Sequence, residues 1–237
     1  MKSLLLFDID GTLIDTEGAG LVSLEEGFFR SFPERSGSRF PALDLGGATD
    51  GSVVAFLFEH FEIEDHDRHR AHFFRNYEEA LAEKLREFLS MKKGRVLPGI
   101  PELLARLAER HHDFVLALLT GNTEAGARIK LESFGLDSYF PFGAFGSDHH
   151  DRNQLGPIAL ERARKATGRS YPTTKALVIG DTGKDIACAR ACGAKVLAVA
   201  TGTVSRETLA ADSPDGLLDD LSDTAEAVEL VESLLDL

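Results

Sequence analysis

The segment LLLFDIDGTL, residues 4–13, runs from an apolar stretch directly into two aspartates and a glycine. Short apolar runs that end in turn residues are typical of buried strands, so we predict a strand from Ser3 to Ile9. Asp8 and Asp10 then lie at the carboxyl end of this strand. Ligands bind at that edge of an open parallel sheet, which makes both aspartates candidates for a functional site.

The rest of the chain repeats the alternation of strand and helix. Three more apolar runs predict strands, at Phe114–Thr120, Ala176–Ile179 and Lys195–Ala200. Amphipathic stretches predict helices, at Thr123–Phe134, Leu155–Thr167 and Asp185–Cys192. Such alternation favours an α/β fold in which helices cover a parallel sheet.

Residues 17–90 interrupt this alternation. They contain three helical patterns and no convincing buried strand, the helices being expected at Leu21–Phe32, Ser52–Phe61 and Asp67–Leu89. Turn-forming residues flank the stretch, namely Gly18, Gly20, Gly94, Pro98 and Gly99. We therefore expect a catalytic core made of residues 1–16 and 91–237, with an all-helical cap of residues 17–90 inserted after the first strand.

The overall charge limits the kinds of partner. The chain has 26 basic and 39 acidic residues in 237, a formal net charge of −13. A surface this negative repels nucleic acid and anionic lipid, so we expect neither as a partner. The first apolar run is too short for a signal peptide, and no stretch has the length of a transmembrane helix. We expect a soluble, cytoplasmic protein that is a monomer or homodimer.

Three of the predicted strands end in polar segments. DIDGTL follows the first strand, TGN (residues 120–122) the second, and GDTGKD (residues 180–185) the third. In a parallel sheet these segments meet at one edge, although they are far apart in the sequence. Each segment alone is typical of an ordinary turn or helix cap. All three together, each closing a strand, indicate a functional site.

The chemistry of these segments points to phosphoryl transfer. Four carboxylates would crowd together there: Asp8, Asp10, Asp181 and Asp185. A hard divalent cation relieves their repulsion, and all-oxygen ligation suits Mg²⁺. Thr120 adds a hydroxyl, while backbone N–H groups beside Gly11 and Gly121 can approach an anion closely. Carboxylates, a metal and anion-binding donors together form a site for phosphate chemistry.

Two other groups of side chains are weaker candidates. His66, His69 and His72 recur every three residues and could bind a metal, but mixed charges around them favour a solvated helix face. Cys188 and Cys192 lack the spacing of a redox pair or a metal site, so we interpret them as small apolar residues.

At this point the sequence resembles the haloacid dehalogenase superfamily of phosphohydrolases, over nearly the whole chain. The DIDGTL motif is the most specific part of the resemblance, and the closest likeness is to members of the phosphoglycolate phosphatase type. The resemblance implies a three-layer, Rossmann-like α/β core with a parallel sheet and an inserted helical cap. It also implies a Mg²⁺-dependent phosphatase that acts on a small phosphorylated metabolite.

The resemblance further implies roles for individual residues. Asp8 is expected to be the nucleophile and a Mg²⁺ ligand. Asp10 is expected to act as general acid and base, and to bind Mg²⁺ through its backbone carbonyl. Asp181 completes the metal site with support from Asp185. The residues expected to bind the phosphoryl group are Gly11, Thr120, Gly121 and Asn122. The dehalogenase branch lacks the second aspartate, so Asp10 favours a phosphate ester or anhydride as substrate.

One departure from the family pattern concerns a cation beside the nucleophile. The family usually supplies a lysine before the helix that precedes the third motif, and residues 151–157 (DRNQLGP) contain none. We expect Arg152 to replace it. Lys184, inside the third motif, is the competing candidate, although it should point outward if Asp181 and Asp185 both face the metal.

Substrate choice in such proteins depends on the cap. The loop LGGATDG, residues 45–51, resembles a family segment that can reach the mouth of the site, which makes Thr49 and Asp50 candidate substrate contacts. A plain helix–helix turn has the same composition. Two rival functions also remain, a mutase of the β-phosphoglucomutase kind and a catalytically silent binding protein. The identity of the substrate is not encoded in any motif we identify.

Overall fold

In the computed structural model, which describes residues 2–237, the N-terminal apolar run forms strand β1 (Ser3–Phe7) inside a six-stranded sheet. The sheet order is β5-β4-β1-β6-β7-β8, and every neighbouring pair is parallel. The remaining strands are β4 (Phe114–Leu119), β5 (Gly143–Ala144), β6 (Ala176–Gly180), β7 (Lys195–Val199) and β8 (Gly216–Leu218). β1 lies between β4 and β6, where the strand order reverses direction and ligand sites form.

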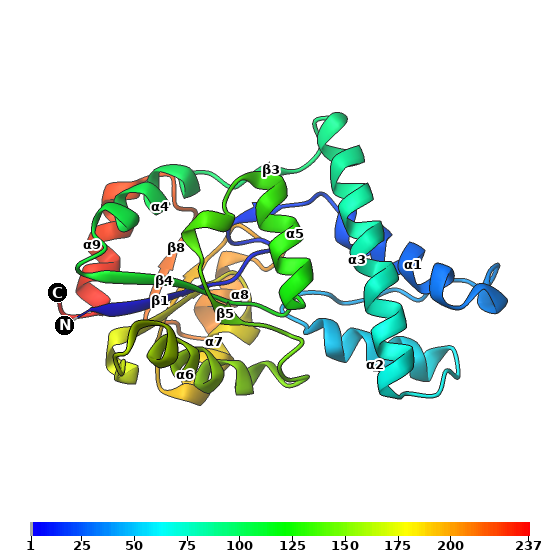
Figure 1. Cartoon of the computed structure of the whole chain (residues 1–237). Coiled ribbons are helices and arrows are strands. Elements are labelled where there is room, and N and C mark those ends of the chain that lie inside the picture. Colours follow the sequence, from blue (N-terminus) through cyan, green and yellow to red (C-terminus); the bar gives the residue numbers. More distant parts are fainter. Residues whose placement is uncertain (1) are drawn as a thin grey trace.

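Helices cover both faces of this sheet (Figure 1). One face carries α4 (Ile100–Glu109), α5 (Glu124–Phe134) and α9 (Thr224–Leu234). The other face carries α6 (Leu155–Thr167), α7 (Gly183–Cys192) and α8 (Arg206–Ala211). Alternate residues of β1 pack against the two helix layers, since Leu5 packs on the first face and Leu4 on the second. This arrangement confirms the predicted α/β class and its parallel sheet.

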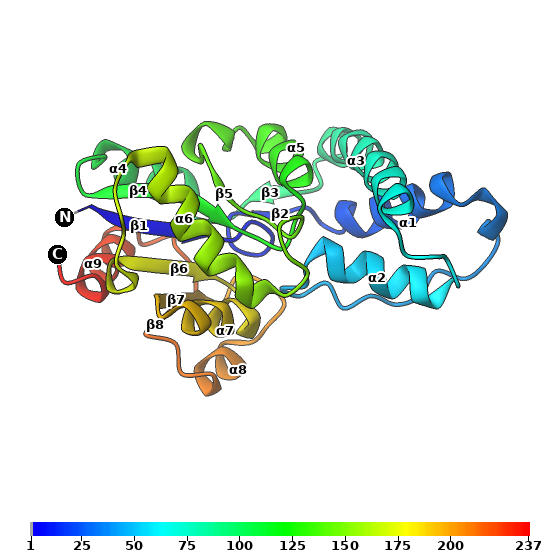
Figure 2. The same ribbon diagram turned by 60° about the horizontal axis from the view of Figure 1, so that its bottom comes forward.

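Between β1 and α4 the chain forms a helical cap at one end of the sheet (Figure 2). Its helices are α1 (Ala19–Ser31), α2 (Asp50–His60) and α3 (Asp67–Ser90). The two chain crossings pair with each other, because β2 (Ile14–Asp15) and β3 (Arg95–Val96) are antiparallel. The predicted inserted cap is thereby confirmed as an element of the fold, while its bounds as a separate unit stay a prediction.

The cap has its own core, which is rich in aromatic rings. The ring centroids of Phe28 and Phe61 lie 4.4 Å apart, and Phe28 also contacts Phe32 and Phe73. Phe134 of α5 packs against the same cluster from the sheet side. The cap therefore rests on α5 and is not attached through its two linkers alone.

Several predicted elements differ from the structure at their ends. The first strand stops at Phe7, so Asp8 and Ile9 already belong to the following loop. α7 starts at Gly183, two residues before the predicted Asp185, because Thr182 caps its N-terminus. The sequence analysis did not predict the short strands β5 and β8, the β2–β3 pair, or helices α4, α8 and α9. Two- and three-residue strands are too short to show a hydrophobic period.

Candidate active site

The first functional carboxylate, Asp8, follows β1 directly and is nearly buried. Its side chain is 7% exposed, and its Oδ2 lies 3.0 Å from Nη2 of Arg152. The pKa of Asp8 is raised to about 6: burial raises it most, Arg152 and the Thr120 hydroxyl lower it, and neighbouring Asp185 raises it. Asp8 is therefore shielded from water, and its negative charge needs a cation nearby.

Asp181 follows β6 and faces the DIDGTL loop. Its Oδ1 accepts a hydrogen bond of 3.1 Å from the hydroxyl of Thr12. Gly11 has φ +78°, and a Cβ there would collide with the Asp181 carboxylate, so only glycine fits this turn. Burial, then Asp185 and Asp8, raise the pKa of Asp181 to about 8. The two motifs are thus in direct contact, as predicted for segments at one sheet edge.

Three buried carboxylates form a group that could hold a metal ion. Oxygen atoms of Asp8, Asp181 and Asp185 all lie within 4.8 Å of one another. Asp185 also closes a capping box, since its Oδ2 accepts from the Thr182 backbone N–H at 3.0 Å and from the Thr182 hydroxyl at 2.7 Å. The donor set is all oxygen, buried and negatively charged, which fits Mg²⁺. The histidines of α3 form no such group within residues 2–237.

Arg152 enters the same group from a short 3₁₀ helix, Arg152–Gln154, that precedes α6. Its side chain is only 6% exposed and pairs with both Asp8 and Asp185. Burial acts to lower the pKa of Arg152, yet Asp185 and Asp8 hold it above its ordinary value. Lys184 is exposed. The geometry therefore brings Arg152, and not Lys184, to the carboxylate predicted as the nucleophile.

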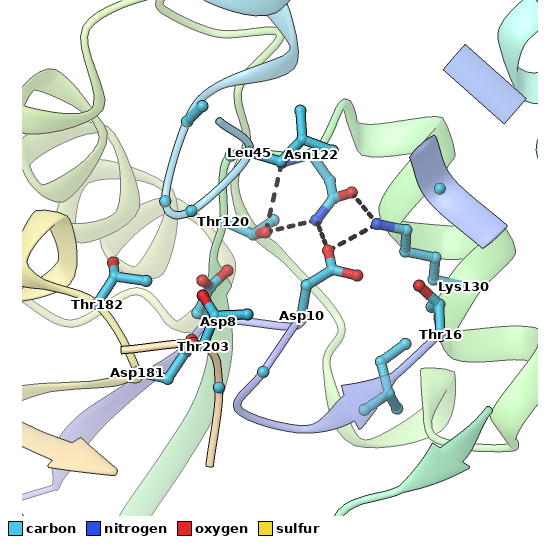
Figure 3. Close-up of a pocket in the computed structure, with 18 of the residues that line it drawn as sticks. Asp8, Asp10, Thr16, Leu45, Thr120, Asn122, Lys130, Asp181, Thr182 and Thr203 are labelled. Carbon is cyan, nitrogen blue, oxygen red and sulfur yellow. Dashed lines mark hydrogen bonds and ion pairs between the residues drawn. The ribbon is translucent and has the colours of Figure 1, made fainter. Parts of the chain in front are cut away.

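Thr120 and Asn122 of the TGN segment after β4 lie across Asp8 from Asp181 (Figure 3). Thr120 is fully buried, and its Oγ1 accepts a 2.9 Å hydrogen bond from Nδ2 of Asn122. The same Nδ2 donates to Oδ2 of Asp10 at 2.8 Å. Asn122 thus links Thr120 to Asp10, and the predicted site residues from the first two strands are in contact.

Asp10 has a partner that the sequence analysis missed. Nζ of Lys130, on α5, lies 2.6 Å from Oδ2 of Asp10 and donates at 2.6 Å to Oδ1 of Asn122 (Figure 3). The Lys130 side chain is only 5% exposed. One signal was available, because Lys130 lies three residues after Ala127 and four before Phe134, within the apolar stripe of its helix.

The cap loop closes against the core at Thr49 and Asp50. The hydroxyl of Thr49 donates to the His150 carbonyl at 2.7 Å and accepts from the Ser52 N–H at 3.1 Å, which caps α2. Thr49 is 1% exposed and is absent from the wall of the main cavity. The geometry therefore gives Thr49 a docking role, and its contact with substrate stays a prediction.

Asp50 also joins the cap to the core, but it does reach the cavity. Its N–H donates to the Gly121 carbonyl at 2.7 Å, and its Oδ2 accepts from the Thr123 N–H at 2.8 Å. Burial raises the pKa of Asp50 to about 6, against the opposing effect of Lys130. A Cβ at Gly121 would collide with the Ala48 carbonyl, so this close approach requires glycine.

A cavity of about 450 Å³ lies between the core and the cap. Its core side contains Asp8, Asp10, Asp181, Thr120 and Arg152, and its cap side contains Leu24, Leu45, Val53 and Tyr77. This volume accommodates a small organic molecule. No helix within the described chain is both long enough and apolar enough to cross a membrane.

Comparisons with known proteins agree with this geometry. Residues 5–190 match the model of the family described as haloacid dehalogenase-like hydrolase. The chain is 30% identical to a protein named probable phosphatase IndB from Dickeya dadantii (strain 3937), over 99% of this chain and 96% of that one. It is 29% identical to a phosphoglycolate phosphatase from Mesorhizobium japonicum, with 86% of each chain covered.

Solved structures share the fold. The structure of CbbY from Rhodobacter sphaeroides in complex with phosphate has a TM-score of 0.71, with 100% of both chains covered and 19% sequence identity. A hydrolase from Pseudomonas syringae has a TM-score of 0.68 at 20% identity, over 97% of this chain and 98% of that one. These likenesses show that the chain shares their fold.

Proposed function

The chain belongs to the haloacid dehalogenase-like hydrolase family, and from that premise we propose that it hydrolyses a small phosphomonoester through an aspartyl-phosphate on Asp8. The position of Asp8 carries the proposal. Its carboxylate lines the cavity, 3.0 Å from a buried arginine and close enough to Asp181 to share a cation with it. Relatives named as phosphatases support the same reaction class.

The proposed reaction has two steps. A carboxylate oxygen of Asp8 attacks phosphorus, the bond from phosphorus to the ester oxygen breaks, and Asp10 gives its proton to that oxygen. A water molecule then attacks the same phosphorus while Asp10 takes its proton, and inorganic phosphate leaves Asp8. Covalent catalysis of this kind divides one difficult hydrolysis into two easier steps.

The phosphoryl group needs donors that are in place before the reaction. Thr120 supplies a hydroxyl, Gly121 supplies a backbone N–H group, and Arg152 supplies a guanidinium that can contact carboxylate and phosphate together. The N–H of Gly11, also expected as a donor, is bonded to the Ile14 carbonyl at 2.9 Å. Preorganised donors stabilise developing negative charge because they need no rearrangement during the reaction. Arg152 thereby takes the place of the lysine that the family usually has.

Mg²⁺ is the proposed cofactor. Asp8 and Asp181 would hold it, with Asp185 and the Asp10 carbonyl completing the set. When bound, it neutralises the crowded carboxylates and polarises a phosphoryl oxygen. The raised pKa values of Asp8 and Asp181 support this fit, because they reflect burial and mutual repulsion that a cation relieves.

Residues 17–90 are proposed to act as one unit that covers the site. Their loop at residues 45–50 closes one side of the cavity and is docked on the TGN segment through Asp50. A cover of this kind excludes water during the first step and keeps the phosphoryl group from leaving early.

Phosphate release from a panel of small phosphomonoesters tests the proposal. The wild type should release inorganic phosphate with Mg²⁺ and lose activity with EDTA, and Asp8→Asn should be inactive in both conditions. Transfer of phosphate to a second sugar without net release would support the mutase instead. Absence of any turnover, including with 4-nitrophenyl phosphate and Mg²⁺, would support a silent binding protein and refute the phosphatase.

A further inference from the structure

The contacts of Lys130 point to a function beyond packing. Lysine is rarely buried without a partner, and this one is directed at the carboxylate proposed as the general acid and base. Its Nζ reaches Oδ2 of Asp10 and Oδ1 of Asn122, both at 2.6 Å. We propose that Lys130 is a positioning residue, which fixes the Asp10 carboxylate for proton transfer. This inference rests on the proposed function.

The two oxygens of Asp10 have different surroundings. Oδ2 accepts from both Lys130 and Asn122, whereas no donor to Oδ1 occurs within the described residues. Oδ1 is therefore the atom left to carry the proton. In the first step this proton moves to the ester oxygen as the bond to phosphorus breaks, while Oδ2 keeps both donors. The same contacts persist after the transfer, so Asp10 needs no rearrangement between its two roles.

The exposure of Asp10 shows why it needs to be held. Its side chain is 43% exposed, and it lacks the surrounding packing that fixes Asp8 at 7%. A mobile carboxylate spends much of its time away from the ester oxygen. Misplacement of a reacting group by about 1 Å can cost roughly a hundredfold in rate. Lys130 also donates to Oδ1 of Asn122, which orients the amide so that its Nδ2 is directed at Oδ2 of Asp10.

The dependence of kcat/KM on the leaving group distinguishes a positioning role of Lys130 from a purely structural one. We would measure kcat/KM for 2,4-dinitrophenyl, 4-nitrophenyl and phenyl phosphate, because kcat/KM covers only the steps up to release of the phenol. Lys130→Met should lose about a hundredfold on phenyl phosphate, the scale of general-acid catalysis, and less than about threefold on dinitrophenyl phosphate, whose leaving group needs no proton. An equal loss on all three, or no loss, would refute the inference.

Further variants of Lys130 and one control complete the test. The double variant Asp10→Asn/Lys130→Met should be no slower than Asp10→Asn alone, because Lys130 acts through Asp10. Additive losses would contradict this. Lys130→Arg should recover part of the phenyl phosphate activity, and Lys165→Met, a change at an exposed lysine of α6, should have wild-type kinetics. If Lys130→Met does not fold, Lys130→Gln carries the same prediction. A wild type inactive on every aryl phosphate would instead refute the proposed function.

A different observation, the charges of the cavity wall, bears on the leaving group. Three cations line the cavity, and each has a carboxylate partner: Arg152 with Asp8, Lys130 with Asp10, and Arg95 with Asp15 at 3.1 Å. Asp50 and Asp181 add further acidic groups. One divalent cation and one phosphate dianion cancel each other, so the filled site keeps its surplus of carboxylates.

Among residues 2–237, the cap side of the cavity provides apolar surface and no free cation. Leu24, Leu45, Val53 and Tyr77 form this wall, and Arg95 at the rim is 62% exposed, where water screens its charge. We infer that the leaving group carries no negative charge, so the substrate is a phosphate ester of a neutral alcohol. A carboxylate there would lose its hydration without gaining a cation. This inference also rests on the proposed function.

Competition between two matched esters tests this inference. Hydroxyethyl phosphate and 2-phosphoglycolate are similar in size and differ in the carboxylate, and both would be titrated against 4-nitrophenyl phosphate hydrolysis. Hydroxyethyl phosphate should inhibit at about tenfold lower concentration than 2-phosphoglycolate, a difference in binding free energy of about 1.4 kcal/mol. Equal or tighter binding of 2-phosphoglycolate would overturn the inference. Failure of the wild type to hydrolyse 4-nitrophenyl phosphate would again refute the proposed function itself.

Discussion

The core and the cap are built from different side chains. The sheet is mainly aliphatic on both faces, and three of the five carboxylates that line the cavity, Asp8, Asp10 and Asp181, follow its strands. Ten of the 16 phenylalanines in the chain lie between residues 17 and 90, and most of them pack in the cap cluster. The core thus positions buried charge, whereas the cap contributes packed apolar surface.

Because of this difference, we expect the core site to control catalysis and the cap cluster to control stability. Buried charges of equal sign destabilise a fold unless they are paired, so the core tolerates its carboxylates only for function. Aromatic packing stabilises the cap without any reacting group. Substitutions at the core site should therefore change the rate, and substitutions inside the cap cluster should change the free energy of unfolding.

The largest effect is expected at the nucleophile. Asp8→Asn keeps the shape of the side chain but removes the attacking carboxylate and one negative charge of the metal site. We predict a loss of turnover of at least about a thousandfold, together with an unchanged or higher midpoint of thermal unfolding without metal. Phosphate release and calorimetry measure the two quantities. Near-normal hydrolysis would exclude Asp8 as the nucleophile.

The matching test in the cap is Phe28→Ala. Phe28 is fully buried and contacts several rings of the cluster, so its removal should lower the free energy of unfolding by about 3–5 kcal/mol. The rate per folded molecule should change by less than about threefold, because Phe28 is absent from the cavity wall. Phe56→Ala is the control, since Phe56 is 46% exposed. Denaturant titration alongside kinetics distinguishes the two expectations.

The next effect concerns the cation beside Asp8. Arg152→Ala should lower kcat by roughly two orders of magnitude, the usual scale for one preorganised donor, and Arg152→Lys should recover part of it. Lys184→Ala should have wild-type kinetics because Lys184 is exposed. If Lys184→Ala is slow and Arg152→Ala is not, the role of the missing family lysine moves to Lys184.

The smallest effect is a pH dependence of stability in the metal-free protein. The pKa of Asp181 is raised to about 8 from an ordinary value of 3.8, so between these values the folded state holds a proton that the unfolded state has lost. Stability should therefore fall as pH rises from about 5 to 8. Asp181→Asn should reduce this fall and unfold a few degrees higher at pH 8. Added Mg²⁺ should stabilise the wild type more than the variant, and identical pH profiles would contradict the prediction.

Much of the fold followed from local patterns. The four long apolar runs became β1, β4, β6 and β7, and the three helical patterns of residues 17–90 became α1, α2 and α3. The short strands β5 and β8 escaped notice because their pairing depends on neighbouring strands, and a run of two or three residues has no period of its own.

The candidate site was predictable where residues lie at strand ends. DIDGTL, TGN and GDTGKD converge because parallel strands end at the same edge, so Asp8, Thr120 and Asp181 could be placed together without coordinates. Arg152 was predicted from its position before the helix that precedes the third motif. The bond from Thr49 to the His150 carbonyl was not predicted, because a turn-like loop does not reveal which surface it contacts.

The sequence by itself determined the four main strands, the carboxylates at the strand ends and the inserted helical stretch, because each depends on neighbouring residues and a simple period. Only the tertiary structure decided which cation meets which carboxylate. Lys130 and Asp10 are 120 positions apart and meet because α5 packs beside the sheet edge. Such a pair leaves no local pattern, since its energy comes from burial and distance, which arise only when the helices and the sheet have packed.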